Sequence, residues 1–499
     1  MTPAALSEAS ALARAGRQPE LPFRLLLDSG GSLTMLRLLR VLPGKRLVGE
    51  AEARGRRVFA KVFLGARSEQ HWQQECAGLA ALRQAGVPTP ELLAAAPLPG
   101  GGHVLLTDFL AAAESLAEAW ARVADRPAGD AAAQALLTPA LALLGRLHAA
   151  GLTQEDLHFG NFLRCGDALF LVDGDAVRVI TPGQPLPAAR AVANLAIFLA
   201  QLPPAWDAHL ETLLPAYAAS AGAPHTAALA ADPAGESLAD SAHRRPAPSP
   251  ALLRAIEGVR NWRLKDFLAK SVRECSLFSV ERSFWRFSSV VRRHAERLAP
   301  VLADPDGVLA RGSILKDGGT VTVARVQLGD GEVLIKRYNL KGFAHACSRL
   351  WRPSRAWHSW RAAHCLQFLG FHTPAPLALI EERYGPLRRR AWLISEFSPG
   401  PNLQTHLSPF ADPPTAEANA LRTLFAGLHA QRISHGDLKA MNLLWDGARI
   451  ALIDLDAVVH HRSPATYRRA WRRDRARLLR NWPPDSPLHL WLDAHLPAG

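Results

Sequence analysis

At 499 residues the chain is too long for one hydrophobic core, and its 48% of apolar residues excludes a largely disordered protein. The net charge of +13 predicts an anionic partner: a nucleic acid, an anionic membrane face or a phosphorylated substrate. The five cysteines are scattered and never spaced as CxxC, which excludes a disulfide framework and a cysteine-bound zinc site.

No segment predicts export or a membrane span. The first residues, MTPAALSEASALARAG, lack a basic stretch followed by an apolar run, so we expect no signal peptide. The longest apolar stretch, near Ala191 to Leu202, is too short to cross a bilayer. We therefore expect a cytoplasmic protein, and its positive charge would favour a peripheral place on a membrane surface.

Hydrophobic periodicity divides the first half of the chain into strands and helices. Alternating apolar residues predict the strands, and glycine or proline marks the helix ends. In chain order we expect a tail over residues 1–20, two strands in RLVGEAEARGRRVFAKVF joined at Arg54-Gly55-Arg56, a helix from Glu69 to Gln84, a buried strand in HVLLTDFL, a helix from Ala131 to Ala150, and apolar helices to about Ser220.

Residues 221–250 are rich in Ala, Pro, Ser and Gly without periodicity, which predicts a flexible linker. Residues 251–300 carry many Arg and Lys among Trp and Phe, and we expect a basic helical connector there. The second half then repeats the order of the first, with strands in SILKDGGTVTVARV, EVLIKRY and AWLISEF, helices from Ser354 to Leu369 and from Ala416 to Gln431, and a C-terminal tail over 483–499. The repetition predicts two tandem domains, at 21–220 and 301–482.

One sequence pattern occurs twice: QEDLHFGNFLRCGDALFLVDGDAV at 154–177 and HGDLKAMNLLWDGARIALIDLDAV at 435–458. In both copies an Asp is followed by an Asn five residues later and by an Asp seventeen residues later. A kinase fold uses these residues, at these intervals, to orient a substrate hydroxyl and to bind the metal of Mg-ATP. Singly each residue is typical of a turn or a cap, but a repeated triplet is poorly explained by chance. The aligned pairs are Asp156 with Asp437, Asn161 with Asn442, Asp173 with Asp454, and Asp175 with Asp456.

In the first copy, Asp156 is the candidate catalytic base, and Asn161 and Asp173 are the candidate Mg²⁺ ligands. Lys61, in the alternating strand VFAKVF, is the candidate ligand of the ATP phosphates, and Glu75 on the following helix would hold it. Alone, this pair is equally compatible with a surface lysine and an unrelated glutamate. The pattern downstream, in the expected order, favours the phosphate-binding interpretation.

In the second copy, Asp437 takes the base position and Lys439, two residues later, would neutralise the transferring phosphoryl group. Asn442 and Asp454 are the candidate metal ligands, and Lys336 in EVLIKRY would bind the phosphates. His435 is expected to support the loop. No glutamate lies between Lys336 and Glu381, and Ser359 aligns with Glu75. Lys336 therefore either lacks its ion-pair partner or is oriented by His358 or His364, and this site is the one of doubtful activity.

The segments HGDLKAMN with IDLDAV, and EDLHFGNF with VDGDAV, resemble the lipopolysaccharide core kinases, the heptose and Kdo kinase family of Gram-negative bacteria. WRAAHCLQFLGFHTPAPLALIE and WQQECAGLAALRQAGVPTPELL also resemble that family, so the similarity covers most of both halves. It implies an α+β protein-kinase-like fold in each half, with a small β-rich N-lobe and a mostly helical C-lobe. It also implies phosphorylation of lipid-A-linked inner-core sugars with ATP and Mg²⁺ on the cytoplasmic face of the inner membrane.

Arginine and tryptophan are concentrated in two stretches of the second half. The combination suits an anionic membrane surface or a phosphorylated glycolipid, but a solvated arginine-rich helix is an equally good interpretation. The first stretch holds Arg349, Trp351, Arg352, Arg355, Trp357, Trp360 and Arg361; the second holds Arg462, Arg468, Arg469, Trp471, Arg472, Arg473, Arg475, Arg477, Arg480 and Trp482.

Three functions remain open from the sequence. The first is a kinase of lipopolysaccharide core sugars that acts at the inner membrane. The second is a protein or small-molecule kinase, which Lys439 permits. The third is a kinase-like adaptor that regulates envelope assembly, for which the missing glutamate of the second copy is the argument. Nucleic-acid binding is not expected, because no nucleic-acid-binding motif accompanies the positive charge.

Overall fold

A computed structural model describes residues 5–6, 8–28, 30–124, 126–222, 225, 248–329, 331–339 and 353–498. The chain divides into two compact units, Met1–Asn261 and Trp262–Gly499. Most of the linker predicted at 221–250 lies outside the described residues. So does a separate segment, 340–352, which contains Cys347, Arg349, Trp351 and Arg352.

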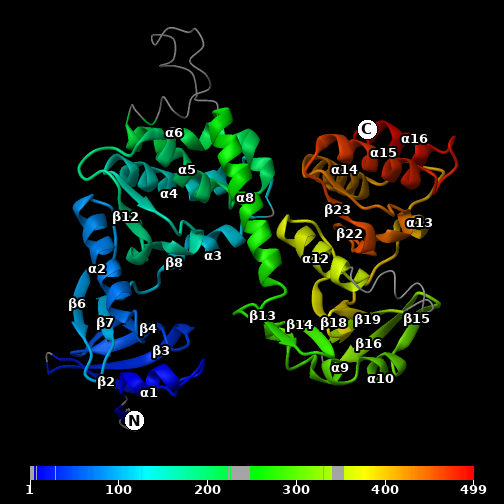
Figure 1. Ribbon diagram of the computed structural model, residues 1–499. Helices are drawn as coiled ribbons and strands as arrows, with labels where there is room; N and C mark the ends of the chain where they lie inside the picture. The colour runs from blue at the N-terminus through cyan, green and yellow to red at the C-terminus, as the bar shows by residue number, and fades with distance from the viewer. Residues whose placement is uncertain are drawn as a thin grey trace, which may run out of the picture. The chain divides into compact units, whose positions relative to one another are not determined.

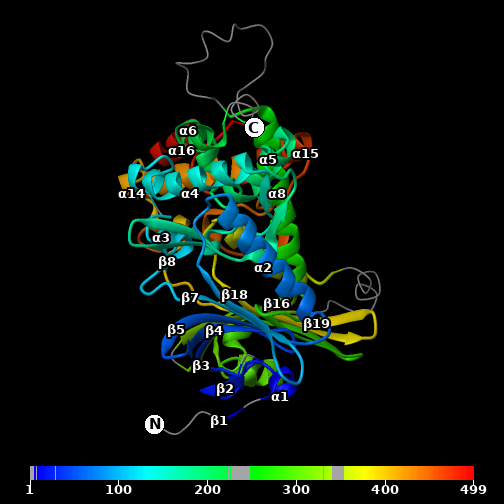
Figure 2. The same cartoon turned by 90° about the vertical axis from the view of Figure 1, so that its left-hand side faces the viewer.

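The first unit has a seven-stranded sheet at one end and helices at the other (Figure 1). The sheet order is β1-β2-β3-β4-β5-β7-β6, and α2 crosses beside it (Figure 2). Arg54 and Gly55, which join β4 to β5, both have positive φ, as the tightest hairpins require. The strands are β1 (Ala5–Leu6), β2 (Phe23–Leu26), β3 (Ser32–Leu42), β4 (Arg46–Ala53), β5 (Arg56–Phe63), β6 (Leu92–Pro97) and β7 (His103–Asp108), and the helices before the catalytic loop are α1 (Ala9–Arg14), α2 (Ser68–Gln84), α3 (Leu116–Ala121) and α4 (Ala131–Ala149).

Short strand pairs and helices complete this unit around the first candidate catalytic loop, which we define as residues 154–161; its counterpart in the second unit is residues 435–442. α4 begins at Asp130, whose carboxylate accepts two backbone N–H groups, and its leucines lie in the largest core cluster of the chain. The remaining elements are β8 (Glu114–Ser115), β9 (Leu152–Gln154), β10 (Phe162–Cys165), β11 (Ala168–Leu171), β12 (Val177–Val179), α5 (Ala188–Leu199), α6 (Leu210–Ala221) and α8 (Pro250–Lys270), whose last residues belong to the second unit.

The second unit repeats this plan. Its sheet order is β13-β14-β18-β19-β17-β16-β15, so five strands, β15 to β19, correspond to β3 to β7 in order and direction. The elements are β13 (Phe278–Arg282), β14 (Arg286–Val291), α9 (Ala299–Ala303), α10 (Pro305–Ala310), β15 (Ser313–Gly318), β16 (Val321–Leu328), β17 (Gly331–Tyr338), α12 (Arg355–Phe368), β18 (Pro376–Tyr384), β19 (Leu387–Glu396), α13 (Leu403–His406), α14 (Thr415–Ala430), β20 (Ile433–Ser434), β21 (Leu443–Trp445), β22 (Ile450–Leu452), β23 (Val459–His460), α15 (Pro464–Leu479) and α16 (Pro487–His495).

Three expected irregular or connecting segments have a different structure. The expected N-terminal tail contains α1, which buries Ala9 and Leu12 against the first sheet. The expected helical connector at 251–300 contains β13 and β14, which extend the second sheet beside β18. The expected C-terminal tail contains α16, because Leu488 and Leu492 repeat at helical spacing and pack into the second helical core. Among the described helices none is long and apolar enough to cross a membrane.

Candidate active sites

In the first unit the sheet, α2 and the catalytic loop bring three charged side chains together. Lys61 of β5 donates to Glu75 Oε1 at 2.6 Å and to Asp173 Oδ1 at 2.9 Å. Burial acts to lower the pKa of Lys61, but Glu75 and Asp173 overcome it, so the pKa is raised above its ordinary value. The lysine therefore stays charged, and it joins the sheet to the residue expected to bind the metal.

Glu75 also fixes the loop that follows Asp173. Its carboxylate, 1% exposed, accepts the backbone N–H groups of Gly174 and Asp175 at 3.0 and 3.2 Å. The helix can approach because a Cβ on Gly78 would lie only 1.9 Å from the Gly174 carbonyl oxygen. Glycine at these two positions is thus a condition of the Glu75 contacts.

The first catalytic loop is held by hydrogen bonds between its own residues. Asn161 donates through Nδ2 to the carbonyl of Asp156 at 2.8 Å, which turns its amide oxygen away from that carbonyl. Gln154 donates to the carbonyl of Asp173 at 2.8 Å and accepts the N–H of Asp156 at 3.1 Å. Asp173 has a left-handed backbone with φ of 72°, which aspartate tolerates better than most residues. The side chain of Asp156 remains 57% exposed, so its carboxylate is accessible from solvent.

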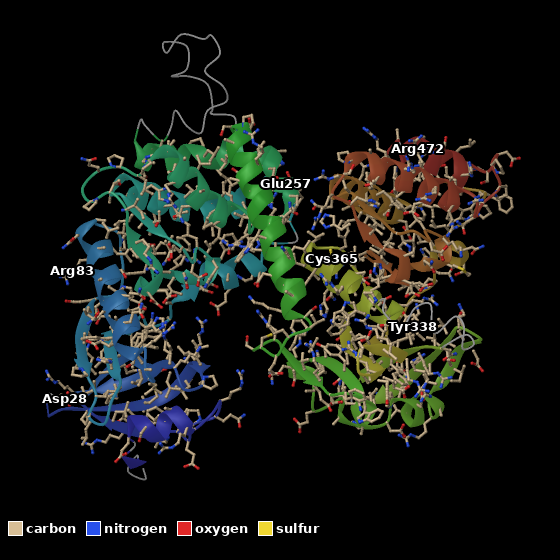
Figure 3. The ribbon with its side chains drawn as sticks, in the orientation of Figure 1. Asp28, Arg83, Glu257, Tyr338, Cys365 and Arg472 are labelled. Carbon is tan, nitrogen blue, oxygen red and sulfur yellow. The ribbon has the colours of Figure 1, made fainter. Side chains whose placement is uncertain are left out.

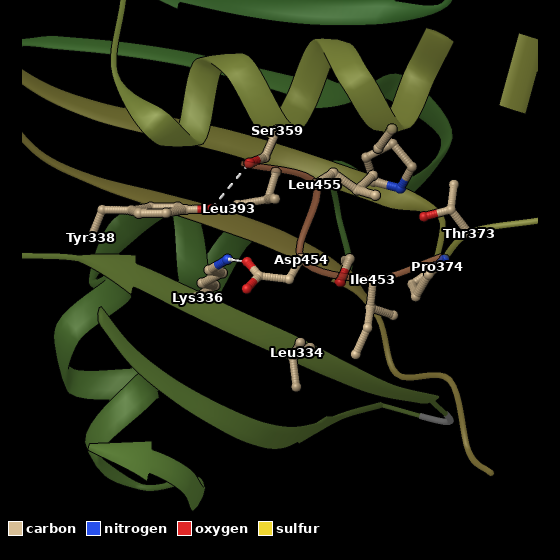
Figure 4. Close-up of a pocket in the computed structure, with 13 residues that line it drawn as sticks. Leu334, Lys336, Tyr338, Ser359, Thr373, Pro374, Leu393, Ile453, Asp454 and Leu455 are labelled. Carbon is tan, nitrogen blue, oxygen red and sulfur yellow. Dashed lines mark hydrogen bonds and ion pairs between the residues drawn. The ribbon is translucent and has the colours of Figure 1, made fainter. Parts of the chain in front are cut away.

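In the second unit Lys336 of β17 bonds to Asp454 Oδ1 (Figure 4). It also donates to Asp456 Oδ1 at 3.1 Å. Burial opposes the charged form, yet the negative charges around it raise the pKa of Lys336. Asp454 again has a left-handed backbone, with φ of 57°. The lysine and this loop aspartate therefore meet in both units.

Asp456 takes the place of the missing glutamate. Its Oδ1 accepts Lys336, Tyr338 Oη at 2.6 Å and Ser359 Oγ at 2.6 Å, and its Oδ2 accepts Arg355 at 2.5 Å. In the first unit the aligned Asp175 instead pairs with Arg46 at 2.8 Å. The alignment of Asp175 with Asp456 was the one sequence signal that pointed to this carboxylate.

Neither histidine considered for Lys336 orients it. His358 Nε2 bonds to the carbonyl of Val458 at 2.8 Å, and His364 packs against Phe267, Phe278 and Trp360. Burial lowers the pKa of His364 to about 3, so it is neutral and offers no charge to the site. Both alternatives considered for Lys336 are therefore wrong: it does not lack an ion-pair partner, because Asp454 and Asp456 pair with it, and neither His358 nor His364 orients it.

The second catalytic loop places two cations on Asp437. Lys439 Nζ lies 3.0 Å from Asp437 Oδ1, and Arg477 of α15 bonds to the same oxygen. Partial burial acts to raise the pKa of Asp437, but Lys439 and then Arg477 lower it below its ordinary value. Asn442 donates to the carbonyl of Asp437 at 2.8 Å, as Asn161 does in the first unit. His435 supports the loop, as expected, through a contact of 3.0 Å with the carbonyl of Ile453.

A small cavity of about 70 Å³ lies beside Lys336. Its lining includes Leu334, Leu393 and Ile453 together with the polar ends of Lys336, Ser359 and Asp454 (Figure 4). An apolar wall with a lysine and a carboxylate at one end suits a flat base followed by phosphates. The amide oxygens of Asn161 and Asn442 and the carboxylates of Asp173 and Asp454 are hard oxygen donors, which suit Mg²⁺. The chemistry of these residues is thus compatible with a nucleotide and a divalent metal in the second unit, and the aligned residues of the first unit offer the same types of oxygen donor.

The arginine–tryptophan stretches are separated by the structure. Trp360, Trp471 and Trp482 are only 0%, 1% and 6% exposed, so they are core residues and not membrane-interface residues. None of the arginines of α15 is among the buried residues of that helix, whereas Trp471 is. Arg472 is labelled among the C-terminal helices in Figure 3. Sequence order placed arginine and tryptophan together, and the helical period separated them.

Comparisons with known proteins give one family match and two structural neighbours. A family model described as "Lipopolysaccharide kinase (Kdo/WaaP) family" matches residues 58–178 and 316–488, which is more than half of the chain. Among solved structures, "WaaP in complex with acyl carrier protein" is 23% identical with a TM-score of 0.29, over 36% of this chain and 77% of that one. "Structure of vaccinia related kinase 3" is 11% identical with a TM-score of 0.26, over 35% and 57%. No curated protein matches.

Proposed function

Because the chain belongs to the lipopolysaccharide kinase (Kdo/WaaP) family, we propose that it transfers the γ-phosphoryl group of ATP to a sugar hydroxyl of the lipopolysaccharide inner core, on heptose or Kdo. The observation that carries the proposal is the Lys–Asp–Asn–Asp set, assembled in both units with the same loop hydrogen bond from the asparagine to the first aspartate. Each unit would then be a kinase domain with a β-rich and a helical lobe.

The residues divide the work as follows. Lys61 and Lys336 hold the phosphates of ATP, and Asn161 with Asp173, or Asn442 with Asp454, bind Mg²⁺, which supplies charge neutralisation when bound. Asp156 and Asp437 orient the acceptor hydroxyl and take its proton. Because Lys439 and Arg477 lower the pKa of Asp437, the carboxylate is ionised at neutral pH and can accept a hydrogen bond from the acceptor hydroxyl. Lys439 is also placed to neutralise charge on the transferred group.

The test is transfer of labelled γ-phosphate from Mg-ATP to purified lipopolysaccharide core. Wild type is compared with Asp156→Ala, Asp437→Ala and the double variant. Loss of a general base costs about 10²- to 10⁴-fold in rate, so the variant of an active unit loses most of its transfer while nucleotide binding is retained. If both single variants transfer phosphate at the wild-type rate, the catalytic assignment is wrong.

The same assay distinguishes the two alternatives. ATP binding without transfer to core would favour the adaptor, and transfer to a protein instead of core would favour a protein kinase. The argument for an adaptor was the missing glutamate of the second copy. Asp456 supplies a carboxylate to Lys336, so that argument loses its basis.

We further infer that the protein works against the cytoplasmic face of the inner membrane. The support lies in the second unit, where Phe284, Trp285 and Tyr384 are exposed at 52%, 63% and 53%. Their ring centroids lie 4.9 to 5.2 Å apart, so they form one patch at the tips of two hairpins, β13–β14 and β18–β19. Exposed Arg282, Arg389 and Arg390 are close in sequence to these tips. Aromatic rings with arginine are typical of a membrane interface.

A further inference from the structure

A second cavity, of about 630 Å³, lies between α15 and the catalytic loop of the second unit. Three arginines line it: Arg473 and Arg477 of α15, and Arg480, which caps the C-terminal end of this helix. They follow one another at i, i+4 and i+7, so they share one face of the helix. Gly436, next to Asp437, lines the same cavity. The cavity is thus adjacent to the candidate base.

The positive charge in this cavity has little compensation. Among the described residues, Arg473 and Arg480 have no carboxylate partner, and Arg480 bonds only to the carbonyl of Ala476 in its own helix. The lining carboxylate, Asp474, is 2% exposed and accepts the N–H groups of His435 and Gly436 at 2.6 and 3.0 Å. Like charges four residues apart destabilise a helix, so a ligand that neutralises them would be bound favourably.

A histidine in the lining adds no charge at neutral pH. Burial, and then Arg473, lower the pKa of His461, although Asp474 opposes them. Its Nε2 lies 2.7 Å from Ser434 Oγ, so one hydroxyl and one imidazole complete the polar lining. The cavity therefore combines three guanidinium groups with a neutral hydroxyl and imidazole and with one buried carboxylate, Asp474, which is engaged by two backbone N–H groups.

The first unit lacks these arginines. Asn194 of α5 accepts the N–H of Gln154 at 3.3 Å, as Asp474 accepts that of the aligned His435, so the two helices can be aligned. Ala193, Ile197 and Ala200 then stand at the positions of Arg473, Arg477 and Arg480. The same element beside the same loop is apolar in one unit and basic in the other. The basic lining is therefore a feature of the second unit and not of the shared fold.

We propose that this cavity binds an anionic group, a phosphate or a carboxylate, already present on the acceptor of the second unit. Arg477 joins the bound anion to the base, since it bonds to both the Asp437 carboxylate and the Gly436 carbonyl. The anion fixes where the reacting hydroxyl lies relative to Asp437. This inference rests on the proposed kinase function, but anion binding is measurable without turnover.

The test is titration calorimetry of the full-length, ATP-free protein with glucose 6-phosphate, glucuronate and inorganic phosphate, and with glucose as the neutral probe. The cavity variant is Arg473→Gln with Arg480→Gln. The matched control is Arg468→Gln with Arg469→Gln, two exposed arginines of the same helix outside the cavity. Arg477 is left intact because it contacts the candidate base.

Wild type and control should bind at least one anionic probe at one saturable site, while the cavity variant binds it about tenfold or more weaker, as expected for lost charged hydrogen bonds. Which sugar probe binds decides between phosphate and carboxylate. Saturating non-hydrolysable ATP analogue should not displace the probe. Equal losses in control and cavity variants, displacement by the analogue, or no anion binding would each overturn the proposal.

Two further measurements test the proposal: the kinetic constants for the core acceptor and binding to anionic vesicles. With core acceptor, the cavity variant should raise KM for the acceptor more than it lowers kcat, because these arginines bind substrate without contacting Asp437. If the variant instead loses binding to anionic vesicles and keeps its KM, the arginines serve a lipid surface and the acceptor site is refuted. No transfer in wild type, with intact anion binding, would refute the kinase and leave the anion site.

Discussion

Single residues decide which carboxylate holds the lysine of each candidate site. In the first unit the carboxylate comes from α2, because Gly78 and Gly174 let the helix approach the loop. In the second unit Ala362 and Leu455 stand at these positions, and the carboxylate comes from the loop itself, as Asp456. In both units a charged lysine thus lies beside the aspartate proposed to bind the metal, but a different carboxylate holds it in each.

This difference predicts unequal effects of the same substitution in the two units. Asp456→Asn should weaken ATP binding by the second unit about tenfold, since it removes the charge-assisted hydrogen bond to Lys336. Asp175→Asn, at the aligned position, should leave ATP binding unchanged, because Asp175 pairs with Arg46 and not with Lys61. Nucleotide titrations in an Asp437→Ala background separate affinity from turnover. Restored affinity in Asp456→Asn with Ser359→Glu would show that Lys336 needs a nearby carboxylate.

At the scale of elements, five strands of one sheet correspond to five strands of the other, and the two sheets differ in the strands added at their edges. The first sheet adds β1 and β2 beside β3, and the second adds β13 and β14 beside β18. The added β13–β14 hairpin carries Phe284 and Trp285 at its tip, where Tyr384 of β18 meets them. The added strands thus give the second unit an aromatic surface without altering its catalytic loop.

We predict that this hairpin tip binds anionic membranes. Replacing Phe284, Trp285 and Tyr384 together by Ser should lower co-sedimentation with phosphatidylglycerol vesicles about tenfold, because interfacial binding scales with the apolar area buried in the lipid. The control is the triple replacement of Ile314, Leu315 and Met441, which are also exposed at about half of their surface. Vesicle binding that falls equally in both variants, or in neither, would contradict the assignment.

At the scale of the whole molecule, each unit buries a neutral histidine in its core. His148 of the first unit contacts Tyr217 and Asn194, and burial lowers its pKa to about 4. His364 of the second unit sits among aromatic rings with Nε2 unpartnered, and burial lowers its pKa to about 3. The unfolded chain, with ordinary histidine pKa near 6.5, binds more protons in the window between these values.

Acid should therefore destabilise both units. The free energy of unfolding is expected to fall as pH drops below about 6.5, by at most about 1.4 kcal/mol per pH unit for each histidine. Urea unfolding of wild type, His364→Leu and the exposed control His495→Leu at pH 7 and pH 5.5 measures the effect. His364→Leu should show the smaller pH dependence, and a slope identical to that of wild type would contradict the assignment.

The sequence by itself determined the local features of this protein. The spacing of Asp, Asn and Asp, the lysine in an alternating strand and the helix boundaries near Ser68, Ala131, Arg355 and Thr415 depend on residues close in the chain. Membership of the kinase family followed from these local patterns, and the family match bears it out. Such features are readable because turn chemistry and periodicity act over a few residues.

Only the tertiary structure decided which distant residues meet. Asp456 replaces a glutamate at a different place in the chain, Arg477 reaches Asp437 from 40 positions away, and Trp471 turns from a suspected surface residue into a core residue. The segments expected as tails and connector fold because their apolar residues find partners in the two cores. These outcomes depend on packing between elements, which sequence spacing does not encode.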